Sequence, residues 1–312
     1  MSPASPEFCS GFMPDISVVI PTYNRLDTLE YVIPSLLDQD LDPSRYEIIV
    51  ADSQSNDGTA EFFEAIAPVA RSVRHLPGRY SGRAAARNAG IEAATGEIVV
   101  FNDSDIIASR DLLTRHLERH TGQRDIAVVG QEVQAHSLAE YRMKRDHPEL
   151  RAPLHPERRK RLSWLYFLTG NASVRRADLL RVGCFDESFT GYGHEDLELG
   201  YRLQHAGVAI CYEPRAVNYH LQDVPHEDQK AKMELAGRST VRFYRKHPDF
   251  AVMANLGMTP VSLGIHSLFE KMPRVVQYLD ERAESSALAR NLVQQYHYVS
   301  GIKSALAQKD GQ

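Results

Sequence analysis

The fold is decided by the run Ile16-Ser17-Val18-Val19-Ile20-Pro21-Thr22-Tyr23-Asn24-Arg25 and by the segments that follow it. The apolar, largely β-branched residues 16–20 are typical of a buried strand, which Pro21 closes. A helical pattern comes next, with Asp27 as its expected N-cap and apolar residues recurring on one face as far as Leu37. A strand, a loop and a helix in this order are the first unit of an α/β fold.

The same order repeats along the chain. Strands are predicted over residues 46–52, 72–76 and 97–101, and helices from Thr59 and over residues 84–94. Strands that alternate with helices imply a parallel sheet, whose ligands bind beyond the carboxyl ends of the strands. Asp52 and Asp103 both lie at such ends. We therefore expect an α/β fold with a Rossmann-like, mostly parallel central sheet flanked by helices, and a ligand site near these two aspartates.

Length and composition narrow the class of protein. The chain has 312 residues, 43% of them hydrophobic, which is enough for one large α/β domain or for a domain plus a helical appendage. A net charge of −5 and a pI near 6.2 argue against a nucleic-acid binder. No apolar run is long enough for a transmembrane helix. The three cysteines are too scattered for a disulfide framework or a zinc site, so the expected location is the cytoplasm, with peripheral contact at the inner face of the membrane left open.

The domain organisation follows from where the periodicity changes. We expect residues 1–14 to form a tail, and residues 15–222 to form one domain with halves 15–108 and 109–222. Residues 223–312 are expected to form a mainly helical extension. The stretch from Arg142 to Arg161 contains eight basic residues and is interpreted as a solvated, mobile connection. The alternative is a lid or a surface that docks an anionic acceptor.

Asp103-Ser104-Asp105 is the first candidate for chemistry. Two carboxylates at positions i and i+2 of an extended segment point the same way, so both can face one cation. Such hard oxygen ligands suit Mg²⁺ or Mn²⁺, which bridge protein carboxylates to substrate phosphates. Aspartate and serine are also ordinary turn residues, but their place at the end of a predicted strand favours the metal site.

Glu195 and Asp196 are the second candidate. They follow the glycine-rich Gly191-Tyr192-Gly193-His194 and open a helix predicted over residues 195–205, which Gly207 ends. Acidic residues in a first turn commonly do no more than complement the helix dipole. The same dipole, however, keeps a carboxylate ionised at neutral pH, so that it can accept a proton. His220 carries little weight alone, because the chain has 13 histidines.

Several motifs in order resemble family 2 glycosyltransferases with the GT-A fold. The run from Ser17 to Arg25 is similar to the opening strand and nucleotide loop of that family, and residues 52–59 to its second motif. Residues 85–91 and the triplet Asp103-Ser104-Asp105 follow in the family's order. The stretch from Thr169 through Leu203 resembles the acceptor half, especially in bacterial chondroitin-type polymerases and galactosyltransferase-like modules. The resemblance covers about residues 15–222.

The resemblance implies a role for each matching residue. Thr22 and Tyr23 would line the base pocket, and Asp52 would accept a hydrogen bond from uracil. Asp103 and Asp105 would hold Mn²⁺ or Mg²⁺, and His220 would complete the metal site. Asp196 would be the catalytic base, with Glu195 as the competing carboxylate. The nucleotide-sugar site as a whole would comprise Pro21, Thr22, Tyr23, Arg25, Asp52, Gln54, Arg83, Arg87, Asp103, Ser104, Asn171 and Glu195. Gln54, where many relatives are acidic, and His194, where a small residue is common, depart from the pattern.

These implications predict an inverting transfer of a sugar from a UDP-sugar to a hydroxyl of a glycan, a lipid-linked molecule or a small molecule. A retaining enzyme needs a nucleophile close to the anomeric carbon, and the sequence offers no clear one. A nicotinamide-dependent oxidoreductase needs a glycine-rich turn where this chain has Pro21-Thr22-Tyr23-Asn24. A non-catalytic module that binds nucleotide sugars or glycans is the remaining alternative, although it has no need of Asp196.

Overall fold

The computed structural model describes residues 14–151, 161–221 and 226–308, with side chains of the last range described from residue 228. The chain forms two compact units. The first comprises residues 1–187 and 199–222, and the second residues 188–198 and 223–312. Residues 188–198, expected to belong to the 109–222 half, thus pack with the C-terminal helices.

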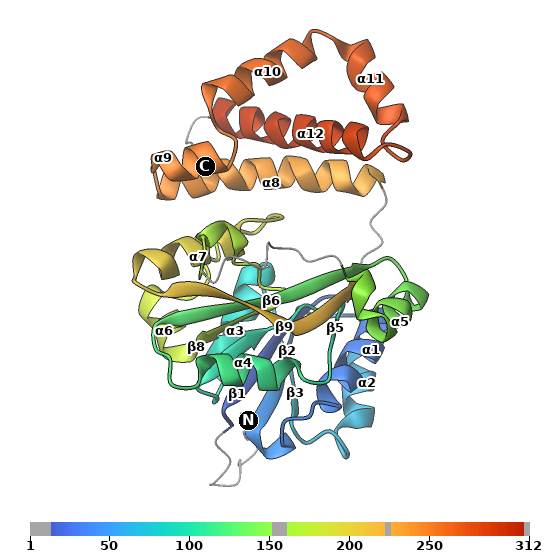
Figure 1. The fold of residues 1–312 in the computed structure, drawn as a ribbon, viewed down its shortest axis with the longest axis vertical. Helices are drawn as coiled ribbons and strands as arrows, with labels where there is room; N and C mark the ends of the chain where they lie inside the picture. The colour runs from blue at the N-terminus through green and yellow to red at the C-terminus, as the bar shows by residue number, and fades with distance from the viewer. Residues whose placement is uncertain (1–13, 152–160, 222–225, 309–312) are drawn as a thin grey trace. The chain divides into compact units, whose positions relative to one another are not determined.

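The first unit is built on a mixed sheet of nine strands, in the order β3-β2-β1-β4-β8-β6-β9-β5, with β7 paired to β9 (Figure 1). The strands are β1 (Ile16–Thr22), β2 (Tyr46–Asp52), β3 (Val73–Pro77), β4 (Ile98–Phe101), β5 (Ile106–Ala108), β6 (Ile126–Ala135), β7 (Arg161–Leu162), β8 (Ala172–Arg175) and β9 (Ala209–Leu221). The four predicted strands β1 to β4 pair in parallel, which confirms the expected start of the fold. β8 runs antiparallel to β4 and β6, so the later part of the sheet departs from the parallel pattern.

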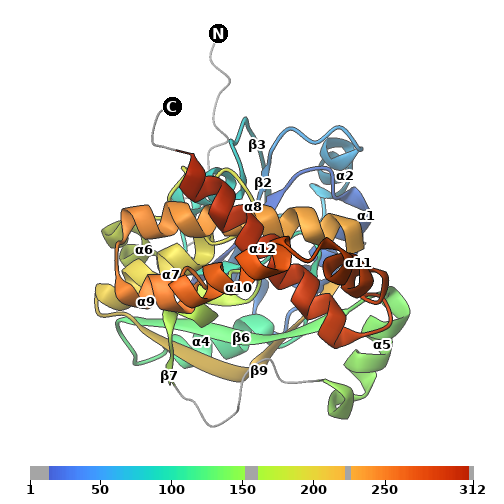
Figure 2. The ribbon, with the colours of Figure 1, turned by 90° about the horizontal axis from the view of Figure 1, so that it is seen from above.

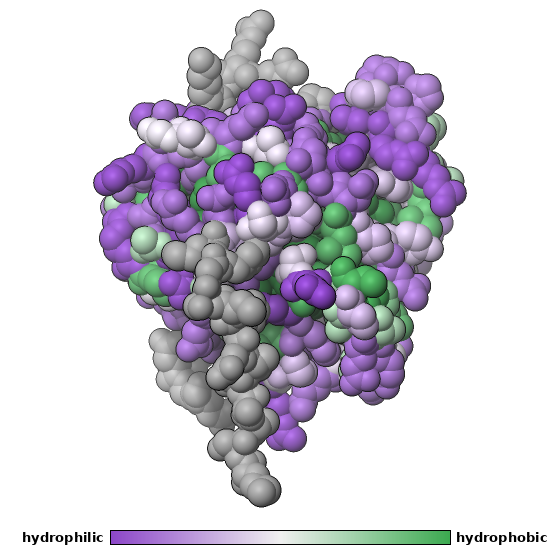
Figure 3. Space-filling model, turned by 90° about the horizontal axis from the view of Figure 1, so that it is seen from below, coloured by the Kyte–Doolittle hydropathy of each residue, from purple (hydrophilic) through white to green (hydrophobic). Residues whose placement is uncertain are grey.

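Helices cover this sheet. They are α1 (Leu26–Leu37), α2 (Thr59–Ile66), α3 (Arg83–Ala93), α4 (Leu112–His120), α5 (Leu138–Asp146), α6 (Arg176–Val182) and α7 (Glu195–His205), the last of which begins in the second unit. α3 packs on β1 and β2, α4 on β6 and β9, and α1 on β5. Strands β1, β2 and β4 and helix α1 supply much of the buried apolar core. Figure 3 shows a face on which hydrophilic residues predominate and hydrophobic ones form smaller areas.

The N-cap prediction for α1 is wrong. The helix begins at Leu26, with Arg25 at the N-cap position, and Asp27 lies inside the first turn. The carboxylate of Asp57, from the next loop, accepts the hydrogen bond of the Leu26 backbone N–H at 2.9 Å. A helix end can be satisfied by any nearby acceptor, and here tertiary structure supplies one that local spacing does not reveal.

The second unit is helical, as predicted for the C-terminal extension. It contains α8 (His226–Lys246), α9 (Phe250–Asn255), α10 (Pro260–Glu270), α11 (Pro273–Glu281) and α12 (Ala287–Ala307). α12 crosses α8 in close contact (Figure 2). A Cβ atom on Gly237 would lie 2.0 Å from the Tyr298 carbonyl oxygen, and one on Gly301 would lie 2.1 Å from that of Glu234. Only glycine allows the two backbones to approach this closely.

The basic stretch from Arg142 to Arg161 is only partly a connection. Arg142, Lys144 and Arg145 lie in α5, and a short 3₁₀ helix follows at Pro148–Leu150. Residues 152–160, which include three of the predicted mobile basic residues, lie outside the described residues. Among the described helices, none is long and apolar enough to cross a membrane.

Candidate active site

The carboxyl ends of β1 and β2 bring Thr22 and Asp52 side by side. The two residues are paired in register, and the Ser53 N–H donates to the Thr22 carbonyl oxygen at 2.9 Å. Both side chains are buried. The Thr22 hydroxyl is buried without a hydrogen-bond partner among the described residues, which is costly unless a ligand or water satisfies it. The carboxyl ends of β1 and β2 therefore meet at one polar point.

Both carboxylate oxygens of Asp52 are held in place. Oδ1 accepts hydrogen bonds from the Ser55 N–H at 2.9 Å and the Ser55 hydroxyl at 2.6 Å. Oδ2 lies 3.0 Å from Nε2 of His75, on β3. The His75 ring in turn stacks on Phe63 of α2, with ring centroids 4.6 Å apart. His75 was not among the predicted site residues, because only the pairing of β2 with β3 brings it to Asp52.

The loops after β1 and β2 are tied together by their polar side chains. The Asn24 N–H donates to the Ser55 hydroxyl at 2.8 Å, and the Asn56 N–H donates to the Asn24 side-chain oxygen at 2.8 Å. Asn24 and Gln54 both have positive φ, at 50° and 60°. Tyr23 is 61% exposed beside this frame, where its ring is available to a ligand. Of the other predicted loop residues, Pro21 is buried, and Arg25 and Gln54 are exposed.

Arg87 and Asp103 form a second polar pair at this end of the sheet. The Arg87 side chain, from α3, is 1% exposed and donates to the Asp103 carboxylate at 2.7 Å. The guanidinium also lies over the Phe185 ring, 5.5 Å from its centroid. Burial raises the pKa of Asp103, but the charges of Arg87 and Arg83 and the Arg87 hydrogen bond outweigh it and lower the pKa overall. Asp103 is therefore a stable carboxylate at neutral pH.

The two aspartates of the triplet have different nearest partners. Ser104 and Asp105 lie in a turn, closed by the Ile106 N–H donating to the Asp103 carbonyl oxygen at 3.2 Å. The extended segment expected from the sequence is therefore wrong, because the chain turns here to start β5. The Asp103 carboxylate contacts Arg87, whereas an oxygen of Asp105 lies 3.5 Å from Nε2 of His220. Ser104 between them is buried.

His220 lies between two carboxylates. Its Nε2 faces Asp105, and its Nδ1 lies 3.0 Å from Oε1 of Glu132 on β6. Gln134 donates to the same Glu132 oxygen at 2.7 Å. Burial lowers the pKa of His220, but the hydrogen bonds and charges of Asp105 and Glu132 raise it to about 10. The three side chains therefore form a chain of ion pairs.

Glu132 depends on a glycine of the predicted acceptor motif. A Cβ atom on Gly170 would lie 2.3 Å from Oε2 of Glu132 and 2.8 Å from the side chain of Ile106. The Gly170 carbonyl oxygen also accepts a hydrogen bond from buried Asn218 at 2.7 Å. Glycine at this position thus leaves the space in which Glu132 reaches His220.

Asn171 is engaged in the interior instead of facing the polar edge. Its side chain is 2% exposed and donates to the Ala216 carbonyl oxygen at 2.9 Å. Its Oδ1 lies 2.9 Å from Nε2 of His116, on α4. These contacts give Asn171 a structural role between α4 and β9, and nothing in its surroundings favours the predicted contact with a nucleotide sugar.

Glu195 and Asp196 lie in the second unit, at the start of α7. Glu195 is 4% exposed, whereas Asp196 is partly exposed and accepts a hydrogen bond from the Leu197 N–H at 2.8 Å. The preceding His194 has a φ of 72°, and its Nε2 lies 2.7 Å from Thr240 of α8. Burial lowers the pKa of His194 to about 4, so its ring is neutral at pH 7.

The fold is that of the GT-A glycosyltransferases. Residues 17–183 match the model of glycosyl transferase family 2, and residues 155–226 match the N-terminal domain of galactosyltransferase. The chain belongs to glycosyl transferase family 2.

Individual relatives agree with this assignment. The chain is 31% identical to validoxylamine A glucosyltransferase of Streptomyces hygroscopicus subsp. limoneus over 77% of its own length. It is 27% identical to the chondroitin synthase of Escherichia coli over 74% of its own length. The chain spans 58% of the first relative and 39% of the second.

A solved structure supports the fold. The mannosyltransferase of Pyrobaculum calidifontis, in complex with GDP-Man and Mn²⁺, superposes with a TM-score of 0.64 at 19% identity, covering 96% of this chain and 89% of that one. The GT-A fold predicted from the sequence is thereby confirmed, as is the resemblance to family 2 and to chondroitin-polymerase-like modules.

Proposed function

We propose that this protein is an inverting glycosyltransferase that moves a sugar from a UDP-sugar to a hydroxyl acceptor with the help of a divalent cation. The observation that carries the proposal is the contact of His220 with both Glu132 and Asp105, near the ion pair of buried Arg87 with partly exposed Asp103, in a chain of this family. Residues 15–108 are the proposed nucleotide-binding half and residues 109–222 the acceptor half, with His220 and Glu132 of the second half at the metal.

Asp105 and the residues around it are suited to hold a divalent cation. In the described residues, no three His, Cys, Asp or Glu side chains converge as a preformed metal cluster. Asp105 and Nε2 of His220, however, are 3.5 Å apart, close to the separation of about 3 Å expected for two neighbouring ligands of one ion. Glu132 on Nδ1 is the outer carboxylate that metal-binding histidines commonly have. Mn²⁺ or Mg²⁺ held by Asp105 and His220, with Asp103 nearby, would act as a Lewis acid on the leaving diphosphate.

The ends of β1 and β2 offer groups that can bind the nucleotide of the donor. The unpartnered hydroxyl of Thr22 and the exposed ring of Tyr23 offer a hydrogen bond and a stacking surface for a base. Asp52, fixed by Ser55 and His75, is an acceptor of the kind that a uracil N–H requires. Arg83 and Arg87 would attract the phosphates. The GDP-Man bound by the similar mannosyltransferase supports a nucleotide-sugar donor, and it makes GDP the alternative to UDP.

Asp196 is the proposed base. Its partial exposure allows an acceptor hydroxyl to reach it, whereas Glu195 is buried. At the start of α7 the helix dipole favours the ionised carboxylate, which takes the proton as the hydroxyl attacks the anomeric carbon. One base and one displacement give inversion of the anomeric configuration. A binding module without catalysis is the competing function, and it would have no use for this base.

The test is nucleotide release from a panel of UDP-sugars, with GDP-Man in parallel, in Mn²⁺, Mg²⁺ or EDTA. We expect release with a UDP-sugar and metal, little in EDTA, and a large loss in Asp105→Asn. Glu61→Gln, at an exposed position of α2, is the control. Release that persists in EDTA would contradict the metal, and no release from any donor would favour the binding module. NMR of the product decides the mechanism, since a retained anomeric configuration would exclude inversion.

A further inference from the structure

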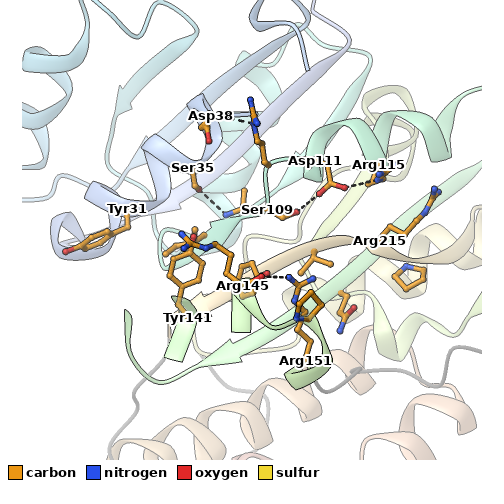
Figure 4. Close-up of a pocket in the computed structure, with 18 of the residues that line it drawn as sticks. Tyr31, Ser35, Asp38, Ser109, Asp111, Arg115, Tyr141, Arg145, Arg151 and Arg215 are labelled. Carbon is orange, nitrogen blue, oxygen red and sulfur yellow. Dashed lines mark hydrogen bonds and ion pairs between the residues drawn. The ribbon is translucent and has the colours of Figure 1, made fainter. Parts of the chain in front are cut away.

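We propose that a cavity on the first unit, separate from the residues assigned to the donor, binds the phosphate or carboxylate groups of an anionic ligand, with Arg151 as its central donor. The cavity measures about 880 Å³ and lies between α1, the start of α4, α5 and β9 (Figure 4). This size suits a ligand as large as a short oligosaccharide or a phosphorylated metabolite. None of the donor-site residues named above lines it.

The lining of the cavity is rich in arginine. Five of the lining residues are arginines and two are acids, Asp38 and Asp111. The arginines come from separate parts of the first unit: Arg110, Arg115, Arg145, Arg151 and Arg215. Figure 4 shows four of them, Arg115, Arg145, Arg151 and Arg215, around the cavity with Tyr31 and Tyr141. Arginine presents a planar fork of N–H donors that matches phosphate and carboxylate, so such a set favours an anionic ligand.

Three of these arginines already form ion pairs with carboxylates of this chain. Arg115 bonds Asp111 at 2.9 Å, Arg145 bonds Asp146 at 2.8 Å, and Arg215 bonds Glu213 at 2.8 Å. Because a carboxylate offsets the charge of each of these arginines, the three pairs add little net positive charge to the cavity. What they contribute is oriented N–H donors. Arg110, by contrast, approaches Asp38 only at 3.9 Å and its side chain is 75% exposed. The excess positive charge of the cavity therefore rests on Arg110 and Arg151.

Arg151 is held in position by neutral groups. Its Nε donates to the Lys144 carbonyl oxygen at 2.9 Å, and one terminal nitrogen donates to the Arg145 carbonyl oxygen at 2.9 Å. Its guanidinium lies over the Tyr219 ring, 5.5 Å from the centroid. Within the described parts of the chain, Arg151 forms no ion pair with a carboxylate. One edge of the Arg151 guanidinium is fixed by carbonyl oxygens at the end of α5, and the N–H donors on its other edge remain for a ligand.

This arrangement accounts for part of the basic stretch noted in the sequence. Arg145 and Arg151 belong to it, and both line the cavity. Tyr141 supports the same wall, since the Arg145 guanidinium lies 5.7 Å from its ring centroid. A guanidinium fixed by carbonyl oxygens and a ring binds an anion with little further ordering, which is what a preformed site requires.

The experiment is calorimetric titration of the full chain with two probes, inorganic pyrophosphate and glucuronate, and with maltose as the neutral comparison. We expect the wild type to bind at least one anion in a salt-sensitive manner, and Arg151→Gln to bind it at least about tenfold more weakly. Arg151→Lys keeps the positive charge but lacks the planar set of N–H donors of a guanidinium, so this variant should also bind the anion more weakly than the wild type. Arg71→Gln, at an exposed position outside the cavity, should bind like the wild type.

Arg83→Gln separates this site from the donor site. It should retain pyrophosphate binding at the cavity, whether or not the chain proves to release UDP from any donor. The preferred probe decides between a phosphorylated and a carboxylated ligand. The proposal is overturned if neither anion binds, if Arg151→Gln and Arg151→Lys both bind like the wild type, or if only Arg83→Gln loses binding. Equal binding of maltose by the wild type and by Arg151→Gln, without anion binding, would also overturn it. Circular dichroism of each variant shows whether it is folded.

Discussion

Nε2 of His194 lies 2.7 Å from the hydroxyl oxygen of Thr240, 46 positions further along the chain. Thr240 is fully buried on α8, and its hydroxyl also lies 2.5 Å from that of Tyr298 on α12. The Ser239 hydroxyl donates to the Tyr192 carbonyl oxygen at 3.1 Å in the same region. The C-terminal helices therefore hold the turn that leads into Asp196, which gives the helical extension a role that no motif in it suggested.

Thr240→Val should lower sugar transfer without weakening donor binding. Valine keeps the shape of threonine but removes the hydroxyl, so the ring of His194 loses its closest hydrogen-bond partner. The expected loss of stability is about 1–3 kcal/mol, and the turn before Asp196 should become less ordered. Steady-state kinetics should show a lower kcat with an unchanged KM for the donor. Ser285→Ala, also in the second unit, is the control. A variant with wild-type kcat would mean that the contact serves stability alone.

Asp196→Asn and Glu195→Gln should differ sharply. If Asp196 is the base, its amide variant keeps size and shape but cannot take the proton, and transfer should fall about 10²- to 10⁴-fold. Donor affinity should stay within a few-fold of wild type, because the change removes an interaction of the transition state. Single-turnover measurements at saturating donor compare the two variants. A large kinetic loss in Glu195→Gln, with a small one in Asp196→Asn, would assign the base to Glu195.

The sequence was most informative where structure is local. Residues 46–52 form β2 and residues 195–205 form α7 with the predicted bounds, because apolar periodicity and glycine stops act within a few residues. The sequence was least informative where contacts are distant. Asp57 satisfies the start of α1 across 31 positions, and Glu132 meets His220 across 88. Strand pairing brings such partners together, and one sequence does not show it.

Glu132→Gln should weaken metal binding although Glu132 is not a predicted ligand. Its carboxylate engages Nδ1 of His220 and so orients the ring towards Asp105. Loss of such an outer carboxylate typically costs about 10- to 100-fold in metal affinity. Mn²⁺ titration followed by electron paramagnetic resonance measures this directly. Glu118→Gln, on the exposed side of α4, should leave the affinity unchanged. Equal affinities in the Glu132 variant and the wild type would remove Glu132 from the metal site.

Stability should fall as the pH drops below about 6.5, because α4 buries two neutral histidines. The two ring nitrogens of His116 lie 2.8 Å from the Ser173 hydroxyl and 2.9 Å from Asn171, and Nε2 of His120 lies 2.9 Å from the same hydroxyl. Burial lowers the pKa of His116 to about 4 and that of His120 to about 3.

The sign follows from which state binds the proton first. Unfolded histidine takes it near pH 6.5, whereas the folded rings resist it down to pH 4 or below, so the neutral rings contribute their full stability only above about pH 6.5. Between pH 7.5 and 5 each histidine should cost about 2 kcal/mol of unfolding free energy. Urea unfolding at several pH values measures how the free energy of unfolding depends on pH. His116→Gln should reduce this dependence by the contribution of one histidine, whereas His136→Gln, at an exposed position, should leave it unchanged. A slope unchanged by His116→Gln would show that this ring does not resist protonation in the folded protein.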